Sequence, residues 1–294
     1  HGCGRSWRYQ STNTRRRGNG VDGGFMKRLI AAAVCISIAL GGLLTCSSAS
    51  AEQPPAAPNK KKSKKQPTPT TDPLYSLTLM RQGVVLMQQG RYDEALKRFN
   101  EADRVAPGNA TNANMIGLCY LRKGELDKAF AYFDTALNLV PLFADARNNR
   151  GTTYLAMGQY HLAEVDFMAV LGDSTYPHAK QVHYNLGLTY LERGQLGAAE
   201  DSFRRSIILP NPVFDGYLKL ATLAQKQGEL ERAIVLLEEA KLTFPEAIEV
   251  SFELGKVLTL MGRDDEARPY LEQVISDEPT SDAAASARAL LGVS

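Results

Sequence analysis

The chain has 294 residues, and 44% of them are hydrophobic, which is enough for a sizeable core and excludes a wholly disordered protein. Its net charge of +2 hides two unlike regions. Residues 1–51 carry seven basic residues and one acidic residue, whereas from Asp72 onward the chain has 22 basic and 30 acidic residues. Because a nucleic-acid partner requires a basic surface, the acidic balance of the larger region argues against nucleic-acid binding.

Residues 1–25 are rich in Arg and Gly and show no periodicity, so we interpret them as an unstructured upstream extension, with Met26 as the start of the protein. Met26 and two basic residues are followed by sixteen mostly apolar residues, Leu29 to Leu44. This run contains two glycines and is shorter than the roughly 20 residues of a membrane-spanning helix, which is typical of a secretory signal peptide. We therefore predict a signal peptide over residues 26–51 and an exported, periplasmic protein.

Two processing sites fit this signal peptide, and the sequence leaves both open. Ala49-Ser50-Ala51 is the small-x-small pattern of ordinary signal peptidase, and cleavage there would release a soluble protein. Leu43-Leu44-Thr45-Cys46 resembles a bacterial lipobox, in which the cysteine is acylated, although Thr45 departs from the usual Gly or Ala. Lipidation of Cys46 would instead anchor the protein to a membrane, as expected for a protein of the outer membrane.

Residues 52–73 are dominated by Pro, Lys, Ser, Thr and Gln, with five lysines between Lys60 and Lys65. Such a segment cannot bury enough apolar surface to offset the entropy lost on ordering, so we predict a disordered linker that acts as a tether. Contact of the lysines with an anionic lipid or cell-wall surface is the alternative.

A period of 34 residues runs through the rest of the chain. Six small residues mark it, separated by 34, 34, 36, 34 and 34 positions, and we number each repeat so that they occupy place 8. Only a minimal side chain fits at this place if the first helix of the repeat (helix A) closely approaches the second (helix B). The six residues are Gly83, Gly117, Gly151, Gly187, Ala221 and Gly255.

Other places of the repeat carry the complementary residues of a helical hairpin. Place 20 is always alanine, and place 24 is a large residue that would fill the space beside the small ones. Glycine at place 15 would end helix A with a positive φ, and proline closes four repeats. In chain order these residues are Ala95, Ala129, Ala163, Ala199, Ala233 and Ala267; Phe99, Phe133, Phe167, Phe203, Leu237 and Leu271; Gly90, Gly124, Gly158, Gly194, Gly228 and Gly262; and Pro107, Pro141, Pro245 and Pro279.

This register is that of the tetratricopeptide repeat (TPR), a helix-turn-helix unit. We predict an all-α TPR solenoid, a right-handed superhelix in which residues 282–294 form a capping helix and tail over the last apolar face. Repeat three ends in a loop two residues longer than its neighbours, Gly172 to His178, where the superhelix should be offset. Within residues 74–281, the predicted repeats span 76–109, 110–143, 144–177, 180–213, 214–247 and 248–281.

The repeats contain no catalytic motif of the HExxH, GxSxG or phosphate-binding glycine-loop types. His161, His178 and His183 have no second ligand at metal spacing, and the cysteines show neither disulfide nor zinc spacing. Cys119 is interpreted as a small core residue. We predict that the protein is not an enzyme and uses no cofactor, metal or small-molecule substrate.

In a TPR array, places 2, 5, 9 and 12 of helix A point into the concave groove. In repeats two to four these places are apolar with amides at the edge, which suits an amphipathic helix or an extended peptide. The alternative is that the leucines pack only between adjacent A helices, and Asn149 and Asn185 are expected to support local packing. The groove lacks the Lys and Arg row of carboxylate-clamp TPR proteins. The predicted partner-binding residues are Asn114, Leu118, Leu121, Asn148, Thr152, Leu155, Tyr184, Leu188 and Leu191.

Residues 173–211 combine Tyr176-Pro177 in the long loop with Val182, Asn185-Leu186-Gly187-Leu188 and the helix from Phe203 to Leu209. In these features the chain resembles the type IV pilus biogenesis/stability proteins, which are pilotin-type TPR lipoproteins of Gram-negative bacteria; the Lys-rich tether departs from their pattern. The resemblance implies a scaffold that helps an outer-membrane secretin to reach the membrane and multimerise. The alternatives are a general periplasmic adaptor for envelope or cell-wall assembly and a regulatory subunit of a cell-wall enzyme.

Overall fold

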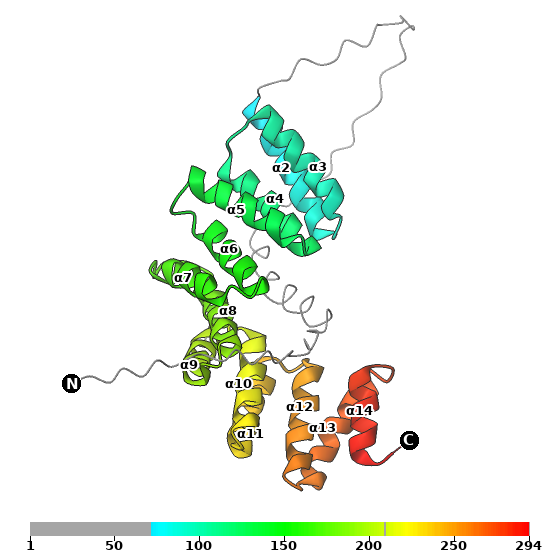
Figure 1. The fold of residues 1–294 in the computed structure, drawn as a ribbon. Coiled ribbons are helices and arrows are strands. Elements are labelled where there is room, and N and C mark those ends of the chain that lie inside the picture. Colours follow the sequence, from blue (N-terminus) through cyan, green and yellow to red (C-terminus); the bar gives the residue numbers. More distant parts are fainter. Residues whose placement is uncertain (1–71, 209, 294) are drawn as a thin grey trace, which may run out of the picture.

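The computed structural model describes residues 72–208 and 210–293. The predicted upstream extension, signal peptide and lipidation site at Cys46, and nearly all of the linker, lie outside these residues. Every regular element of the described residues is a helix, and the helices follow one another as hairpins (Figure 1). They are α2 (Pro73–Gln88), α3 (Tyr92–Val105), α4 (Ala110–Lys123), α5 (Leu126–Leu139), α6 (Ala144–Ala156), α7 (Tyr160–Leu171), α8 (Ala179–Glu192), α9 (Leu196–Ser206), α10 (Phe214–Lys226), α11 (Leu230–Thr243), α12 (Ile248–Leu260), α13 (Asp264–Asp277) and α14 (Asp282–Leu291).

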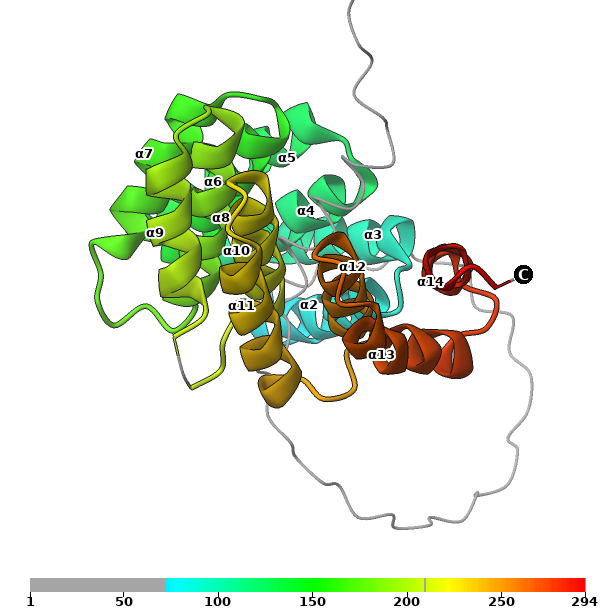
Figure 2. The same ribbon diagram turned by 90° about the horizontal axis from the view of Figure 1, so that it is seen from below.

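The hairpins stack in chain order. In each repeat the even-numbered helix is helix A, and it packs most extensively on helix B of its own hairpin. Each helix B in turn packs on helix A of the next repeat, so that contacts join neighbours along the chain. Figure 2 shows that successive hairpins turn relative to one another and that the array therefore coils. The predicted all-α TPR solenoid is confirmed.

The hairpins close through the contact of a small residue with a large one. A Cβ atom on Gly117 would lie 2.6 Å from the Phe133 ring, and one on Gly187 would lie 2.6 Å from the Phe203 ring. The phenylalanines at place 24 and the alanines at place 20 are fully buried. The predicted complementarity of places 8 and 24 is thereby confirmed.

Local signals set where the helices begin and end. The glycine at place 15 is left-handed in all six repeats, with φ between 72° and 78°, which an L side chain rarely adopts. At the start of α2, Asp72 accepts a hydrogen bond from the Leu74 N–H at 2.9 Å. Asn109 and Ser281 cap α4 and α14 in the same way. The glycine prediction for the turns is confirmed.

The long loop at the end of repeat three folds back onto its own repeat. Tyr176 is buried, and its hydroxyl donates a hydrogen bond of 2.8 Å to Oδ1 of Asp145 in the first turn of α6. Burial raises the pKa of Tyr176, and the nearby Asp145 carboxylate raises it further, so the hydroxyl keeps the proton that it donates. The loop is thus attached to the array by a specific contact.

Repeat three also contains an ion pair that sequence reasoning missed. Arg150 on α6 donates two hydrogen bonds, of 2.8 and 2.9 Å, to the buried carboxylate of Asp166 on α7. It donates a third, of 3.0 Å, to Asp134 on α5. The hydrogen bonds to Asp166 raise the pKa of Arg150 above its usual value. The pair therefore ties both helices of repeat three to helix B of repeat two.

The C-terminal end of the array is covered by α14. This helix packs on both α13 and α12, and it places Ala284 and Ala287 fully buried against them. Small side chains allow this close approach. The cap predicted from the sequence is therefore present.

Candidate functional site

Eight of the nine predicted groove residues are buried, and the ninth, Leu191, is half-buried. The leucines of this row belong to the core clusters that also contain the place-24 phenylalanines. Tyr184 packs on Phe203 with 5.8 Å between the ring centroids. These side chains therefore stabilise the stacked hairpins, and their contact with a partner stays a prediction.

A chain of buried amides and hydroxyls joins the A helices of repeats two to four. Nδ2 of Asn149 donates to Oδ1 of Asn114 at 2.9 Å, which links α6 to α4. Nδ2 of Asn185 donates to Oγ1 of Thr152 at 3.3 Å, which links α8 to α6. Asn149 and Asn185, which we expected to act locally, thus bridge adjacent repeats. Buried polar groups need such partners, so these hydrogen bonds determine how the A helices align with one another.

A different surface is open to solvent, at the N-terminal end of the array. Inside the array, helix A turns places 3, 6 and 10 toward the preceding repeat; in α8 these places are Val182, Asn185 and Thr189, and all three are fully buried. In α2 of repeat one the same places are Thr78, Arg81 and Val85, and all three are exposed. The described residues contain no preceding helix B over them. We call this surface of α2 the open face.

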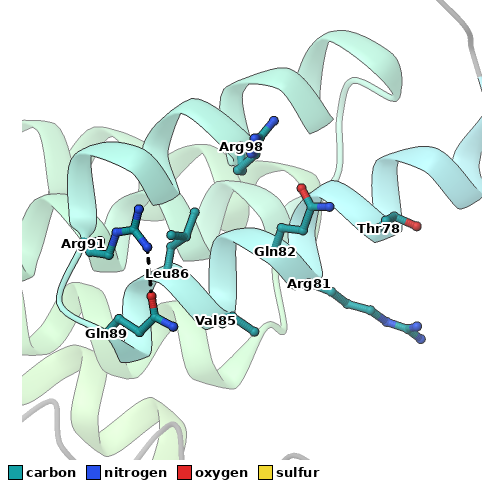
Figure 3. Close-up of a pocket in the computed structure, with 8 residues that line it drawn as sticks. All are labelled: Thr78, Arg81, Gln82, Val85, Leu86, Gln89, Arg91 and Arg98. Atoms are coloured by element: carbon teal, nitrogen blue, oxygen red, sulfur yellow. Dashed lines mark hydrogen bonds between the residues drawn. The ribbon is translucent and has the colours of Figure 1, made fainter. Parts of the chain in front are cut away.

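The open face contains a hollow of about 540 Å³ between α2 and α3 (Figure 3). Val85, which is 50% exposed, and Leu86 give it apolar contact surface, and arginines and glutamines surround them. The apolar surface continues along α2 to Leu74 and Leu77, which are 72% and 46% exposed. The lining residues are Thr78, Arg81, Gln82, Val85, Leu86, Gln89, Arg91 and Arg98. Exposed apolar side chains with a polar rim are typical of a protein-binding surface.

The three arginines of the hollow differ in their partners. Arg91 forms two hydrogen bonds of 2.7 Å with Glu94 and one of 3.2 Å with Gln89, and Arg98 pairs with Glu101 at 3.1 Å. The hydrogen bonds from Arg91 lower the pKa of Glu94, which keeps that carboxylate charged. Arg81 has no carboxylate within 4.0 Å among the residues that the structure describes, and Figure 3 shows it extending away from the other two arginines. Its charge is therefore available to an acidic group.

The open face was missed in the sequence, although a signal for it exists. Places 3 and 10 hold Asn112 and Cys119 in repeat two, and both are buried. Repeat one instead has Arg at place 6, a long charged side chain that does not suit burial against an apolar helix. Comparing the repeats place by place, rather than along one helix, would have marked α2 as unlike the others.

Other kinds of site are not found in residues 72–208 and 210–293. No group of three or more His, Cys, Asp or Glu side chains is arranged to hold a metal ion there. None of the helices in these ranges combines the length and apolar content required to cross a bilayer. Cys119 is fully buried, and burial raises the pKa of its thiol to about 12, so it stays protonated and acts as a core residue.

Two family models for the tetratricopeptide repeat match the chain. One matches residues 80–147 and 148–211, and the other matches residues 224–291. Together the matches span about two thirds of the sequence.

Solved structures share the fold. PilF of Pseudomonas aeruginosa is 20% identical with a TM-score of 0.63, over 74% of this chain and 97% of that one. PilW, described as a widely conserved type IV pilus biogenesis factor, is 22% identical with a TM-score of 0.64, over 72% of this chain and 97% of that one. A tetratricopeptide repeat protein from Parabacteroides merdae is 18% identical with a TM-score of 0.56, over 73% of this chain and 84% of that one. At these identities the likeness shows the solenoid fold, and with the matched family models it establishes that the chain belongs to the tetratricopeptide repeat proteins.

Proposed function

We propose that the protein is a non-catalytic scaffold of the cell envelope that acts in type IV pilus assembly by promoting the localisation or multimerisation of a secretin. The pilus assignment is supported by the features of residues 173–211 and by the shared fold with PilW, a protein described as a pilus biogenesis factor. Protein binding is the role that the TPR architecture supports, since the array offers long surfaces and the sequence has no catalytic motif. Protein binding thus rests on the fold, and pilus assembly on the resemblance.

The observation that carries a binding role is the open face of repeat one. In every later repeat helix A packs on helix B of the preceding repeat. A partner helix docked on α2 would occupy the position that helix B of the preceding repeat has in the later repeats, and it would cover Leu77, Val85 and Leu86. Amphipathic helices bind such surfaces by placing apolar side chains at helical spacing. An acidic residue on the partner would pair with Arg81.

A second copy of this chain fits the open face less well than a different protein. Arg81 lies near the middle of α2, which spans Pro73–Gln88. Two α2 helices packed antiparallel about a twofold axis would bring the two Arg81 side chains together, and like charges repel at short range. We therefore assign the surface to an amphipathic, acidic helical segment of the partner protein.

The proposed location is the periplasm, reached through the signal peptide at residues 26–51. Acylation of Cys46 would fix the scaffold to the outer membrane, whereas cleavage after Ala51 would leave it soluble, and the linker would separate the array from the anchor in the first case. The buried row from Asn114 to Leu191 is proposed as a second contact region, reached only if the A helices move apart.

The experiment is to delete the gene and follow the secretin in separated membranes, with unheated gel samples that preserve its multimers. We expect multimers to be lost or to collect in the inner membrane. Complementation with the wild-type gene should restore them, whereas complementation with Val85→Glu should not. The matched control is Val235→Glu on α11, because Val235 is 53% exposed and lies away from the open face.

Each result decides a separate point. Normal multimers and surface pili in the deletion strain would reject the pilus role and leave a general envelope adaptor or a regulator of a cell-wall enzyme. Restored multimers with Val85→Glu would reject the open face as the binding surface while keeping the pilus role. If Val235→Glu also fails to restore the multimers, the array does not tolerate a new charge at exposed positions. The result with Val85→Glu would then give no support to a binding site at the open face.

A further inference from the structure

A second hollow, of about 470 Å³, lies on the side of repeat four, independently of the open face. Its floor is α8, and its walls are α7 and α9, the B helices of repeats three and four. The stripe of α8 that lines it contains His183, Leu186 and Tyr190, whereas the predicted groove residues of the same helix are Tyr184, Leu188 and Leu191. The hollow therefore faces away from the concave row. Its volume lies within the range of about 300 to 1,000 Å³ that is usual for ligand pockets.

The hollow is lined by Ser202, a short residue at place 23 of repeat four. The other repeats carry a larger residue at this place. In repeats two, three, five and six that residue contacts neighbouring side chains. Tyr132 stacks on Tyr120 with 5.6 Å between centroids, Asp166 is held by Arg150, and Leu236 is buried in the core. Tyr270 packs against the same core cluster in repeat six. Ser202 is too short to fill the equivalent space, so repeat four keeps an opening that its neighbours close.

Three polar groups of this hollow lack internal partners. Nδ1 of His183 is buried without a hydrogen-bond partner, which is costly for a polar atom. Burial lowers the pKa of His183, and the positive charge of Arg205 lowers it further, so its imidazole is neutral at neutral pH. Neither Arg205 nor Asp201, one turn apart at the rim on α9, has an ion-pair partner in the described parts of the chain. The hollow thus has a cation and an anion at its rim, apolar walls, and a buried ring nitrogen without a partner.

We propose that this hollow binds the C-terminal residue of a peptide that ends in an aliphatic side chain. The aliphatic side chain packs against Met168, Leu171 and Leu186. The terminal carboxylate pairs with the Arg205 guanidinium, which offers two parallel donors, and accepts a hydrogen bond from Nδ1–H of His183. Asp201 accepts the backbone N–H of the same terminal residue. Arg205, His183 and Asp201 then each have one counterpart on the ligand.

The test uses the full array and an acetylated, fluorescently labelled tetrapeptide Gly-Gly-Ala-Leu, followed by fluorescence anisotropy. The free-acid peptide should bind, and the same peptide with a C-terminal amide should bind at least tenfold more weakly. Arg205→Gln should weaken binding of the free acid at least tenfold. The matched control is Arg204→Gln, which removes the same charge one residue away on α9, and it should change the affinity less than twofold.

A second variant tests the shape of the hollow. Ser202→Leu introduces the residue that the next repeat has at Leu236 and should abolish binding while leaving the helical circular dichroism unchanged. Equal binding of the acid and the amide, or equal loss with Arg204→Gln and Arg205→Gln, would overturn the proposal. Unlabelled leucine that competes as well as unlabelled acetylated peptide would also overturn it, in favour of a free amino acid. If Ser202→Leu does not fold, the comparison of the two arginine variants decides alone.

Discussion

The two ends of the array solve the same problem in different ways. At the C-terminal end, α14 covers the last hairpin and buries Ala284 and Ala287 on it. At the N-terminal end, α2 exposes the apolar side chain of Val85 together with the polar side chains of Thr78 and Arg81. Solenoids need a polar outer face on their terminal repeats, and α2 meets that need only in part. The C-terminal hairpin is thus covered within the described chain, whereas the proposed contact surface lies at the end where α2 stays open.

Disrupting the cap at the C-terminal end should cause the largest loss of stability. In Ala287→Glu a carboxylate would have to be buried between α14 and α13, so we expect α14 to detach and the array to lose about 3 kcal/mol of stability. Urea unfolding followed by circular dichroism measures the loss. The matched substitution at the other end is Arg81→Glu on α2, which should change the stability by less than about 0.5 kcal/mol. Similar losses for both variants would show that the ends do not differ.

An inner junction extends the comparison, because both of its sides are covered. Asp166→Asn removes the charge that faces Arg150 but keeps the shape of the side chain, and we expect a loss of about 2 kcal/mol. The remaining pair with Asp134 limits the loss. Double-mutant cycles with Arg150→Met measure the coupling between the two residues. A coupling near zero would mean that the ion pair contributes only packing.

The amide chain along the A helices should contribute less. Asn149→Ala removes the hydrogen bond to Asn114 between α6 and α4, and we expect a loss of about 1 kcal/mol. Thermal unfolding of Asn149→Ala and of Asn138→Ala, whose side chain is exposed on α5, provides the comparison. Equal melting temperatures for the two variants would show that the bridge between repeats has no net energetic role.

The smallest effect on stability is expected at the open face itself. Val85→Ala removes two exposed methyl groups, so the unfolding free energy should stay within about 0.5 kcal/mol of the wild type. Binding of the partner should nevertheless weaken, which pull-down of the secretin measures. A clear loss of stability would instead mean that Val85 supports the fold of repeat one and that this end is not free.

The hairpins were predictable because their rules act within one repeat. The small residue at place 8 and the large one at place 24 are 16 positions apart, and they meet as expected in Gly117 and Phe133. The left-handed glycines at place 15 depend only on the local backbone. Periodicity reveals such short-range relations directly.

Relations between repeats were predicted less well. The period shows which side of α8 carries Tyr184 and Leu188, but not how closely the next A helix approaches, so their burial was not foreseen. The Arg150 and Asp166 pair occupies places 7 and 23, and no other repeat has an arginine and an aspartate at these two places. The open face and the hollow at Ser202 are found where one repeat differs from the other repeats at the same place. A search for the shared pattern overlooks such differences.

The position of the open face on α2 also sets how far a bound partner can travel. Among the residues that the structure describes, α2 is the first helix from the N-terminal side, and it begins at Pro73, at the end of the predicted linker. If Cys46 is acylated, Asp72 lies 26 positions after it, and a fully extended chain of that length reaches about 90 Å. A partner held on α2 would then stay within a sphere of that radius around the lipid, however many repeats follow. The distal end of the solenoid would sweep a larger volume and meet components farther from the membrane.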